Sequence, residues 1–159
     1  MRIGVVSDTH GQVRHTQDAV RMLESLEVEL VLHCGDIGSA AVVELFAPWP
    51  THFVFGNVDD PPILRDAIRA ARQTCHERFG QLELAERRIA FLHGDDSRLL
   101  NETAASGAWD LVCHGHTHVA RQQRHGRTLV LNPGAVYRAS PHTIACVELP
   151  QVEATVIEL

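Results

Sequence analysis

The chain has 159 residues and a formal net charge of −6 at neutral pH, and 45% of its residues are hydrophobic and 21% charged. This length suits one ordinary domain that buries a core without disulfide staples, and the composition excludes a globally disordered chain. Because an acidic chain lacks the basic excess that sequence-independent binding of DNA or RNA requires, we expect no stable nucleic-acid binding.

In the first half of the chain, short apolar runs alternate with amphipathic segments. Buried strands are predicted for three apolar runs, at residues 2–6, 30–33 and 51–55. Helices are predicted after these runs, over residues 13–26, 39–46 and 63–71. Ser39 is a candidate N-cap, and Pro61-Pro62 stand near the start of the third helix. This alternation favours parallel strands that are joined by helical crossovers.

The second half has short strands with turns between them. Strands are predicted at residues 75–79, 82–86, 88–92, 109–113, 120–124, 128–131, 143–149 and 153–159. Turns are predicted at Gly80, near Glu86–Arg88, at His125–Arg127 and at Pro150-Gln151, and one helix ends at about Ala105. The whole pattern predicts a single α/β domain over residues 1–159. Its expected architecture is a four-layer α-β-β-α sandwich of two mixed sheets with helices on the outer faces.

The four cysteines are Cys34, Cys75, Cys113 and Cys146, and none belongs to a C-x-x-C pair. Three of them lie in apolar runs, where free cysteine behaves as a small buried hydrophobe. We therefore expect all four to be reduced and the protein to be cytoplasmic. The apolar run at residues 2–6 is too short for a signal peptide, and no stretch approaches the roughly 20 apolar residues of a membrane helix. No membrane partner is expected.

Five polar clusters share one position in this pattern, directly after the carboxyl end of a predicted strand. They are Asp8-Thr9-His10, Gly35-Asp36, Gly56-Asn57-Val58-Asp59, His93-Gly94-Asp95 and Gly115-His116-Thr117-His118. Ligands of open α/β sheets bind at these strand ends, where the loops converge. Asp, Asn and His are the residue types of a mixed oxygen and nitrogen metal site, and the chain has eleven histidines beside only fourteen Lys and Arg. The sequence therefore predicts a metal site at one end of the sandwich.

The motifs D-T-H, G-D, G-N-V-D, H-G-D and G-H-T-H, in this order, resemble those of the calcineurin-like metallophosphoesterase superfamily. Asn132-Pro133-Gly134 resembles the N-P-G-S segment of its small bacterial and archaeal phosphodiesterases, so the resemblance covers essentially the whole chain. It implies that one divalent ion is held by Asp8, His10, Asp36 and His118, and a second by Asp36, Asn57, His93 and His116. Mn²⁺ is the expected ion, with Fe, Zn, Ni and Mg as alternatives.

The resemblance implies hydrolysis of phosphate esters, above all small phosphodiesters, by a hydroxide that bridges the two ions. With two divalent ions, two carboxylates (Asp8 and Asp36) and a hydroxide, the net charge of the centre is about +1, which attracts a phosphate even to an acidic protein. Two ions lower the pKa of a bridging water and clamp the phosphate oxygens. We expect Asp36, Asn57 and Asp95 to be catalytic residues.

Three positions depart from the family pattern. Val58 stands where many members have a histidine that acts as a general acid, so a leaving group must be protonated by water, by Asp95 or by another group. Asp95 replaces a histidine of many small relatives, and its charge disfavours a highly charged monoester. Ala135 replaces the usual serine, a mild change, and the nearby Arg138 is a candidate phosphate contact. These departures favour phosphodiesters as substrates.

A non-catalytic scaffold or protein-interaction module on the same fold is the alternative, with the retromer subunit of this fold as a precedent. Val58 favours the scaffold, whereas the intact set of seven ligand positions favours the enzyme. Asp59 and Asp95 are each either catalytic or orient a metal-bound histidine. The strand-rich second half could supply the surface of a homodimer.

The remaining histidines receive other interpretations. His33 and His114 are expected to be buried residues at strand ends. Surface or turn positions are expected for the other five, His15, His52, His76, His125 and His142.

Overall fold

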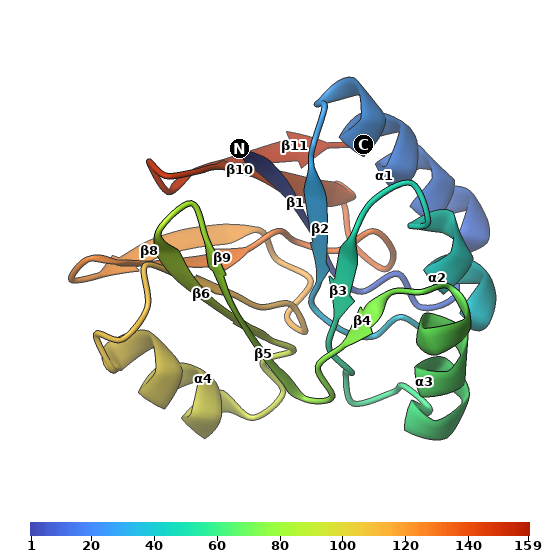
Figure 1. The fold of residues 1–159 in the computed structure, drawn as a ribbon, viewed down its shortest axis with the longest axis horizontal. Helices are drawn as coiled ribbons and strands as arrows, with labels where there is room; N and C mark the ends of the chain where they lie inside the picture. Colours follow the sequence, from blue (N-terminus) through green and yellow to red (C-terminus); the bar gives the residue numbers. More distant parts are fainter.

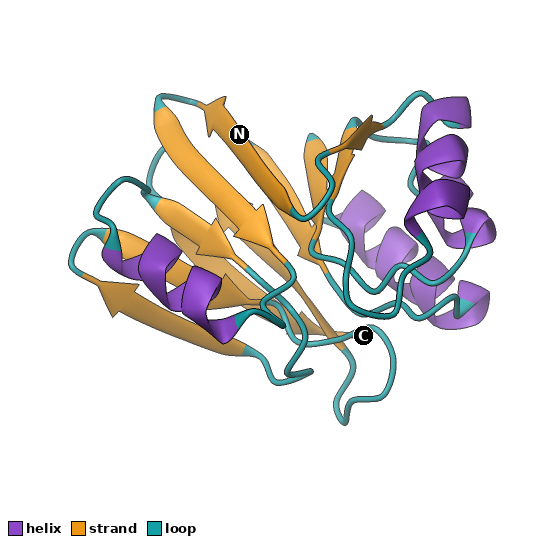
Figure 2. Ribbon diagram, turned by 90° about the horizontal axis from the view of Figure 1, so that it is seen from below, coloured by secondary structure: helices purple, strands orange, loops and turns teal.

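Two mixed β-sheets face each other, and helices cover their outer surfaces (Figures 1 and 2). The computed structural model describes all of residues 1–159. The predicted four-layer α-β-β-α arrangement is confirmed. The loops at one end of the sandwich gather between the strand ends and the helices, as Figure 2 shows from below.

The first sheet has six strands in the order β11-β10-β1-β2-β3-β4. Its strands are β1 (Arg2–Val6), β2 (Leu30–His33), β3 (Thr51–Phe53), β4 (Thr74–Cys75), β10 (Thr143–Glu148) and β11 (Glu153–Glu158). Strands β1 to β4 are parallel, whereas β10 is antiparallel to both β1 and β11. The parallel strands are joined by helices on one face, α1 (Val13–Ser25), α2 (Ala40–Leu45) and α3 (Pro61–Ala70).

The second sheet has five strands in the order β5-β6-β7-β9-β8. Its strands are β5 (Phe79–Leu84), β6 (Arg87–Leu92), β7 (Leu111–Cys113), β8 (Arg121–His125) and β9 (Thr128–Asn132). The three central strands are parallel, and the edge strands β5 and β8 are antiparallel to their neighbours. One helix, α4 (Ser97–Ala105), packs on the outer face of this sheet.

The alternation of side chains along each strand divides the hydrophobic residues among the layers. From β1, Ile3 and Val5 point between the sheets, where they join a cluster that includes Phe91 of β6. Val6 points the other way and packs with the helices on the first sheet. From β6, Leu92 faces α4 in a small third cluster. The central strands of each sheet are therefore buried on both faces, which fixes their register.

Side-chain caps start three of the helices directly after the polar clusters. Ser39, Asp60 and Asp96 accept hydrogen bonds from backbone N–H groups in the first turns of α2, α3 and α4. The predicted N-cap at Ser39 is thereby confirmed, and Pro61-Pro62 occupy the first helical positions of α3. Because such a cap is worth about 1 kcal/mol, these residues keep the loops before the helices short and well defined.

Two predictions for residues 75–80 are wrong. The strand expected at residues 75–79 is only the two-residue β4, and the turn expected at Gly80 lies inside β5. Gly80 pairs with Phe91, and a Cβ atom on Gly80 would lie 2.1 Å from the Phe91 ring. The glycine therefore makes room for an aromatic ring inside a strand and does not mark a turn. The chain turns at Ala85-Glu86, where both residues have positive φ.

The state of the cysteines agrees with what the sequence predicted. All four cysteines are free, and Cys34, Cys113 and Cys146 are buried. None of the helices combines the length and the hydropathy that crossing a bilayer would require.

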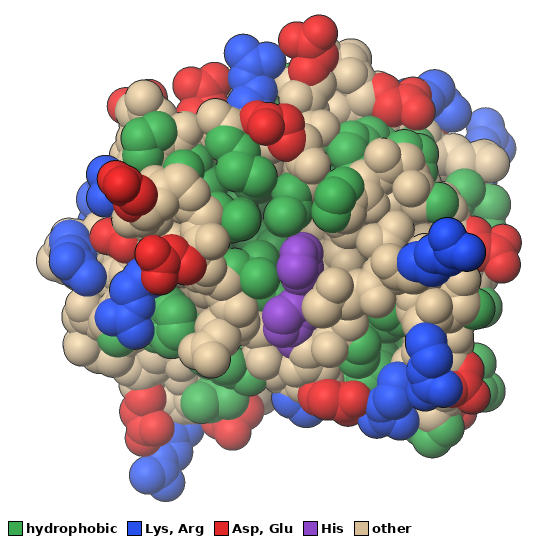
Figure 3. Space-filling model, viewed as in Figure 1, with side chains coloured by type: hydrophobic (Ala, Val, Ile, Leu, Met, Phe, Trp, Pro, Cys, Tyr) green, Lys and Arg blue, Asp and Glu red, His purple; other side chains and the backbone are tan.

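On the face in Figure 3, acidic and basic side chains are interspersed around the margin, and hydrophobic side chains gather near the centre beside histidines. That face carries no single basic patch.

Two histidines that were expected at surface or turn positions pair with each other. His52 Nδ1 of β3 and His76 Nε2 lie 2.8 Å apart, and both side chains are half buried. Burial, together with the neighbouring His76, lowers the pKa of His52 to about 4. The ring of His52 is therefore neutral in the folded protein.

The pKa of His52 predicts a loss of stability in weak acid. Between about pH 6.5, the ordinary pKa, and about pH 4, the unfolded chain binds a proton at His52 that the folded protein does not bind. The free energy of unfolding should therefore fall as the pH falls through this range. Urea denaturation of the metal-free protein and of a His52→Gln variant measures it: the pH dependence should be shallower in the variant. Equal slopes would show that His52 does not contribute.

Candidate metal centre

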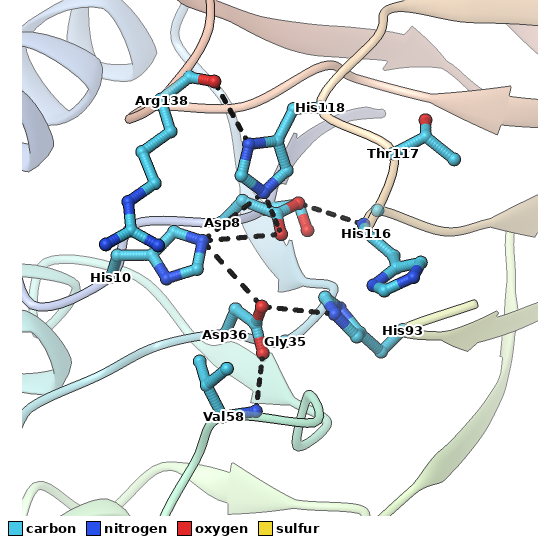
Figure 4. A network of polar contacts seen from close by, with 12 residues as sticks. Asp8, His10, Gly35, Asp36, Val58, His93, His116, Thr117, His118 and Arg138 are labelled. Carbon is cyan, nitrogen blue, oxygen red and sulfur yellow. Dashed lines mark hydrogen bonds and ion pairs between the residues drawn. The ribbon is translucent and has the colours of Figure 1, made fainter. Parts of the chain in front are cut away.

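The polar clusters of the sequence come together at one end of the sandwich. They follow β1, β2, β3, β6 and β7, whose carboxyl ends point the same way because the central strands of each sheet are parallel. Figure 4 shows the side chains of Asp8, His10, Asp36, His93 and His118 around one small space. Residues as far apart as 8 and 118 thus form one cluster.

Two carboxylates stand at the centre of this cluster. The Oδ1 atom of Asp8 lies 3.1 Å from His118 Nε2 and 3.8 Å from His10 Nε2. The Oδ2 atom of Asp36 lies 3.3 Å from His93 Nε2 and 3.7 Å from His10 Nε2. The ligand atoms form two groups that could each hold an ion, Asp8 with His10 and His118, and Asp8 with Asp36 and His93. Within each group they lie within 4.8 Å of one another.

The carboxylate of Asp8 is incompletely satisfied by the protein. Asp8 is 0% exposed, and its Oδ2 atom accepts a hydrogen bond from the backbone N–H of His116 at 3.1 Å. Its Oδ1 atom is buried and accepts no hydrogen bond. A buried carboxylate oxygen without a partner is costly unless a cation compensates it. Carboxylate, amide and imidazole donors around it are those of a divalent transition-metal site, so the residues fit metal ions.

Strained backbone marks the same residues. Positive φ angles occur at five of the candidate ligands, Asp8 (57°), His10 (47°), Asp36 (52°), His116 (67°) and His118 (58°). Residues other than glycine rarely adopt this conformation, and such outliers concentrate at functional sites. Two backbone hydrogen bonds hold the first turns in place, from Asp8 N to Gly35 O (3.0 Å) and from His10 N to Asp36 O (2.8 Å).

Two glycines let backbone approach the carboxylates. A Cβ atom on Gly56 would lie 1.9 Å from Asp36 Oδ1, and one on Gly115 would lie 2.6 Å from Asp8 Oδ2. Any larger residue would therefore displace a carboxylate. This close approach explains why glycine precedes Asn57 and His116 in the motifs.

Hydrogen bonds to backbone carbonyls orient two of the histidines. His93 Nδ1 lies 2.8 Å from Cys34 O, and His118 Nδ1 lies 3.1 Å from Arg138 O. When Nδ1 donates to a carbonyl, the neutral ring presents the lone pair of Nε2, which in both residues faces the carboxylates. Both side chains are therefore arranged as ligands of a cation.

The charges of the site are coupled. Burial opposes ionisation of Asp36, but the hydrogen bond and the charge of His93 outweigh it and lower the pKa of Asp36. Burial likewise acts against protonation of His93, yet its contact with Asp36 raises the pKa of His93. For His10, burial dominates and lowers the pKa. In the metal-free protein, Asp36 and His93 thus each favour the ionised form of the other.

His33 is buried as the sequence predicted, whereas His114 is less buried than predicted. His33 is fully buried at the end of β2, and burial lowers its pKa to about 3. Its Nε2 atom lies 3.0 Å from Thr9 Oγ1, so His33 supports the loop between Asp8 and His10 and does not face the site. His114 is half buried, and burial lowers its pKa.

Three of the predicted site residues stand further from the two carboxylates. Asn57 Oδ1 lies 3.1 Å from His93 Nε2. His116 is exposed, and its ring centroid lies 5.1 Å from that of His93, so only its backbone contacts Asp8. Asp95 pairs with Arg78 at 2.5 Å. Asp59, for which two roles were open, accepts hydrogen bonds from Gly38 N and Gly56 N and so ties two loops together.

Arg78 is a site residue that the sequence did not indicate. Besides Asp95, its guanidinium donates to the backbone carbonyls of Phe55 (3.4 Å) and Gly56 (2.9 Å). It therefore joins the loop that carries Asn57 to the loop that carries His93. Arg78 belongs to none of the motifs, and its partners are mostly carbonyls, so no sequence signal could have identified it.

The sequence and the structure of this chain resemble those of known proteins. A model of the calcineurin-like phosphoesterase superfamily domain matches residues 1–152. The chain belongs to the calcineurin-like phosphoesterase superfamily. The resemblance on which the sequence predictions rested is therefore confirmed.

Relatives of this family resemble the chain over most of its length. The phosphodiesterase MJ0936 of Methanocaldococcus jannaschii is 29% identical over 138 residues, 84% of this chain and 83% of the relative. The probable metallophosphoesterase YsnB of Bacillus subtilis is 30% identical over 143 residues, 86% of this chain and 75% of the relative. A solved structure of an archaeal phosphodiesterase superposes with a TM-score of 0.92 at 28% identity and covers 100% of both chains.

The fold also occurs in Vps29. The Zn²⁺ complex of Vps29 from Entamoeba histolytica superposes with a TM-score of 0.71 at 17% identity, over 98% of this chain and 90% of that one. At this identity the similarity concerns the fold alone.

Arg78 should govern how firmly the site holds a metal ion. In Arg78→Ala the loops of Asn57 and His93 lose their shared partner, so Mn²⁺ affinity should fall by about 10- to 100-fold, as for other residues that orient ligands. Calorimetric titration with Mn²⁺ measures it. Arg98→Ala, which removes an exposed arginine paired with Glu102, is the matched control and should bind like the unchanged protein. An unchanged affinity in Arg78→Ala would contradict the positioning role.

Proposed function

We propose that this chain is a two-metal phosphodiesterase that hydrolyses small phosphodiesters. The observation that carries the proposal is the buried, unpartnered Oδ1 atom of Asp8 among converging carboxylate, amide and imidazole groups. Membership of the calcineurin-like phosphoesterase superfamily supports a phosphoester hydrolase. The relatives that are named phosphodiesterases support the diester as the substrate class.

Seven residues would hold the ions. We assign Asp8, His10, Asp36 and His118 to one ion, and Asp36, Asn57, His93 and His116 to the other, with Mn²⁺ as the proposed metal. The position of Asp36 Oδ2 between His10 and His93 supports its bridging role. His116 requires its exposed ring to turn inward, which its surface position allows. When bound, such a pair of ions supplies a positive centre that clamps phosphate oxygens and activates water at neutral pH.

The protein's own residues would bind and orient the ester. Asp36 and Asn57 face His93 and hold this side of the centre in place. Asp95, which we expected to be catalytic, is held by Arg78 at the rim, 21% exposed, where it could reach a leaving group. The Val58 side chain offers no proton, so protonation of the leaving oxygen falls to water or to Asp95. Diesters with good leaving groups are accordingly favoured over monoesters.

A scaffold on the same fold is the second candidate. Val58, which is 57% exposed beside the site, supports it, because an apolar residue there suits contact with a partner. The unpartnered carboxylate oxygen of Asp8 supports catalysis more strongly, since a scaffold has no need to retain a buried, uncompensated charge. We propose a cytoplasmic enzyme, and a homodimer formed through its strand-rich second half stays a prediction.

Turnover of a diester is the direct test of the function. The Mn²⁺-loaded protein should hydrolyse bis(4-nitrophenyl) phosphate, and its kcat/KM for this diester should exceed that for 4-nitrophenyl phosphate, because Asp95 and Asp96 add negative charge at the rim. Release of 4-nitrophenolate measures both. Absence of turnover with Mn²⁺, Zn²⁺ and Ni²⁺ would refute the enzyme and leave the scaffold.

Asp36→Asn tests the bridging assignment. The amide keeps the shape of the side chain but removes the charge that two ions would share, so kcat/KM should fall by about 10³-fold or more. Urea denaturation should still be cooperative, because the first sheet and its helices are unaffected. Asp66→Asn, on the exposed side of α3, is the matched control and should keep full activity. Retained activity in Asp36→Asn would rule out the bridging role.

A further inference from the structure

Exposed apolar side chains follow the proposed metal ligands closely along the chain. Six large hydrophobic residues are exposed in the whole protein, Met1 (39%), Val13 (38%), Val58 (57%), Ile63 (61%), Leu99 (37%) and Val119 (63%). All but Met1 lie one to six residues beyond a proposed metal ligand. We call these five residues the apolar rim. Single exposed hydrophobic residues are common, but five of six that follow the ligands so closely in the sequence indicate a binding surface.

Val58 is the rim residue nearest to the reacting centre. Its backbone N–H donates to Asp36 Oδ1 at 3.2 Å, so the residue directly adjoins a proposed bridging ligand. Figure 4 shows its side chain beside the Asp36 carboxylate, on the side where Arg138 and His10 lie. A substituent that extends to this side from a phosphate at the centre would therefore pack against the Val58 side chain.

Arg138 supplies a cation without a carboxylate partner on the same side. Its guanidinium lies 5.8 Å from the centroid of the Tyr137 ring and makes no ion pair and no hydrogen bond with the protein, and its backbone carbonyl accepts a hydrogen bond from His118 Nδ1. Figure 4 shows the guanidinium next to His10, and the backbone at Arg138 has a φ of 57°. Because an unpaired guanidinium binds a phosphate oxygen well, Arg138 is placed to contact an anionic substrate.

Two acidic residues follow His93 at the edge of the site. Asp95 lies there with its partner Arg78, and Asp96 caps α4 beside the rim residue Leu99. A second negative charge on a substrate would be repelled from this edge. The surroundings of the site therefore provide one cation, Arg138, for the single negative charge of a phosphodiester. They also provide an apolar side chain, Val58, for the ester groups on the phosphate.

We infer that the substrates are phosphodiesters with an apolar ester group, such as an aryl group, which packs against Val58 while Arg138 contacts a phosphate oxygen. This inference rests on the proposed phosphodiesterase function and narrows its substrate class. The reaction is hydrolysis: the oxygen of water bonds to phosphorus, one ester P–O bond breaks, and the leaving oxygen gains a proton. Polynucleotides and nucleoside polyphosphates, which carry several charges, do not suit the acidic edge.

A pair of diesters with one shared leaving group tests the inference. 4-Nitrophenyl phenyl phosphate and 4-nitrophenyl methyl phosphate both release 4-nitrophenolate, so they differ only in the group that stays on phosphorus. After correction for hydrolysis without enzyme, kcat/KM for the phenyl ester should exceed that for the methyl ester by about tenfold, the scale of a small apolar contact. Val58→Thr, a nearly isosteric polar change, should bring the ratio close to one, and Val58→Leu should preserve it.

Arg138→Ala separates the cation from the apolar contact. It should lower kcat/KM for both esters by a similar factor and leave their ratio unchanged, because both carry the same phosphate charge. A wild-type ratio near one, or a ratio that Val58→Thr does not change, would overturn the inference while turnover itself still upheld the proposed function.

If the protein does not hydrolyse either ester, a binding measurement still tests the preference for an apolar ester group. Calorimetry with diphenyl phosphate and dimethyl phosphate compares the same two kinds of group without turnover. If neither ester is hydrolysed but diphenyl phosphate binds about tenfold more tightly, and Val58→Thr removes this difference, the function fails and the apolar preference stands. If the two phosphates bind equally, the preference fails as well.

Discussion

The buried carboxylate of Asp8 is the constraint on which the metal centre depends. A carboxylate that loses water must be compensated, and the protein compensates only one of its two oxygens, through the N–H of His116. Cations are the natural partners of the other oxygen, and the imidazole nitrogens of His10 and His118 lie beside it. Folding without a metal ion therefore leaves a cost that binding of an ion would relieve, so metal binding and stability should be linked.

The fold brings the compensating groups together through the direction of its strands. The central strands of both sheets are parallel, so their carboxyl ends and the loops after them meet at one end of the sandwich. The caps at Ser39, Asp60 and Asp96 start a helix soon after three of these loops, which limits their freedom. Positive φ angles at five candidate ligands then turn the side chains inward, a local cost that the buried sheets can bear.

Much of this was predictable from the sequence, because the signals are local. Apolar runs, caps and the polar residues after each strand indicated the layers and the clusters of the site. Features that depend on tertiary contacts were not predictable. Gly80 lies in a strand because the Phe91 ring covers it, His52 is half buried because His76 closes over it, and Arg78 binds carbonyls that only the fold brings near. The apolar rim is equally invisible in the sequence, since exposure distinguishes Val58 from any core valine.

The central claim is that one carboxylate cluster holds two ions, and their number can be counted directly. Native mass spectrometry of the protein titrated with Mn²⁺ should show two bound ions per chain, and the Asp8→Asn variant, which keeps the shape of the side chain but removes its charge, should hold fewer than two. One ion at saturation in the unchanged protein, or two ions in the variant, would contradict the account.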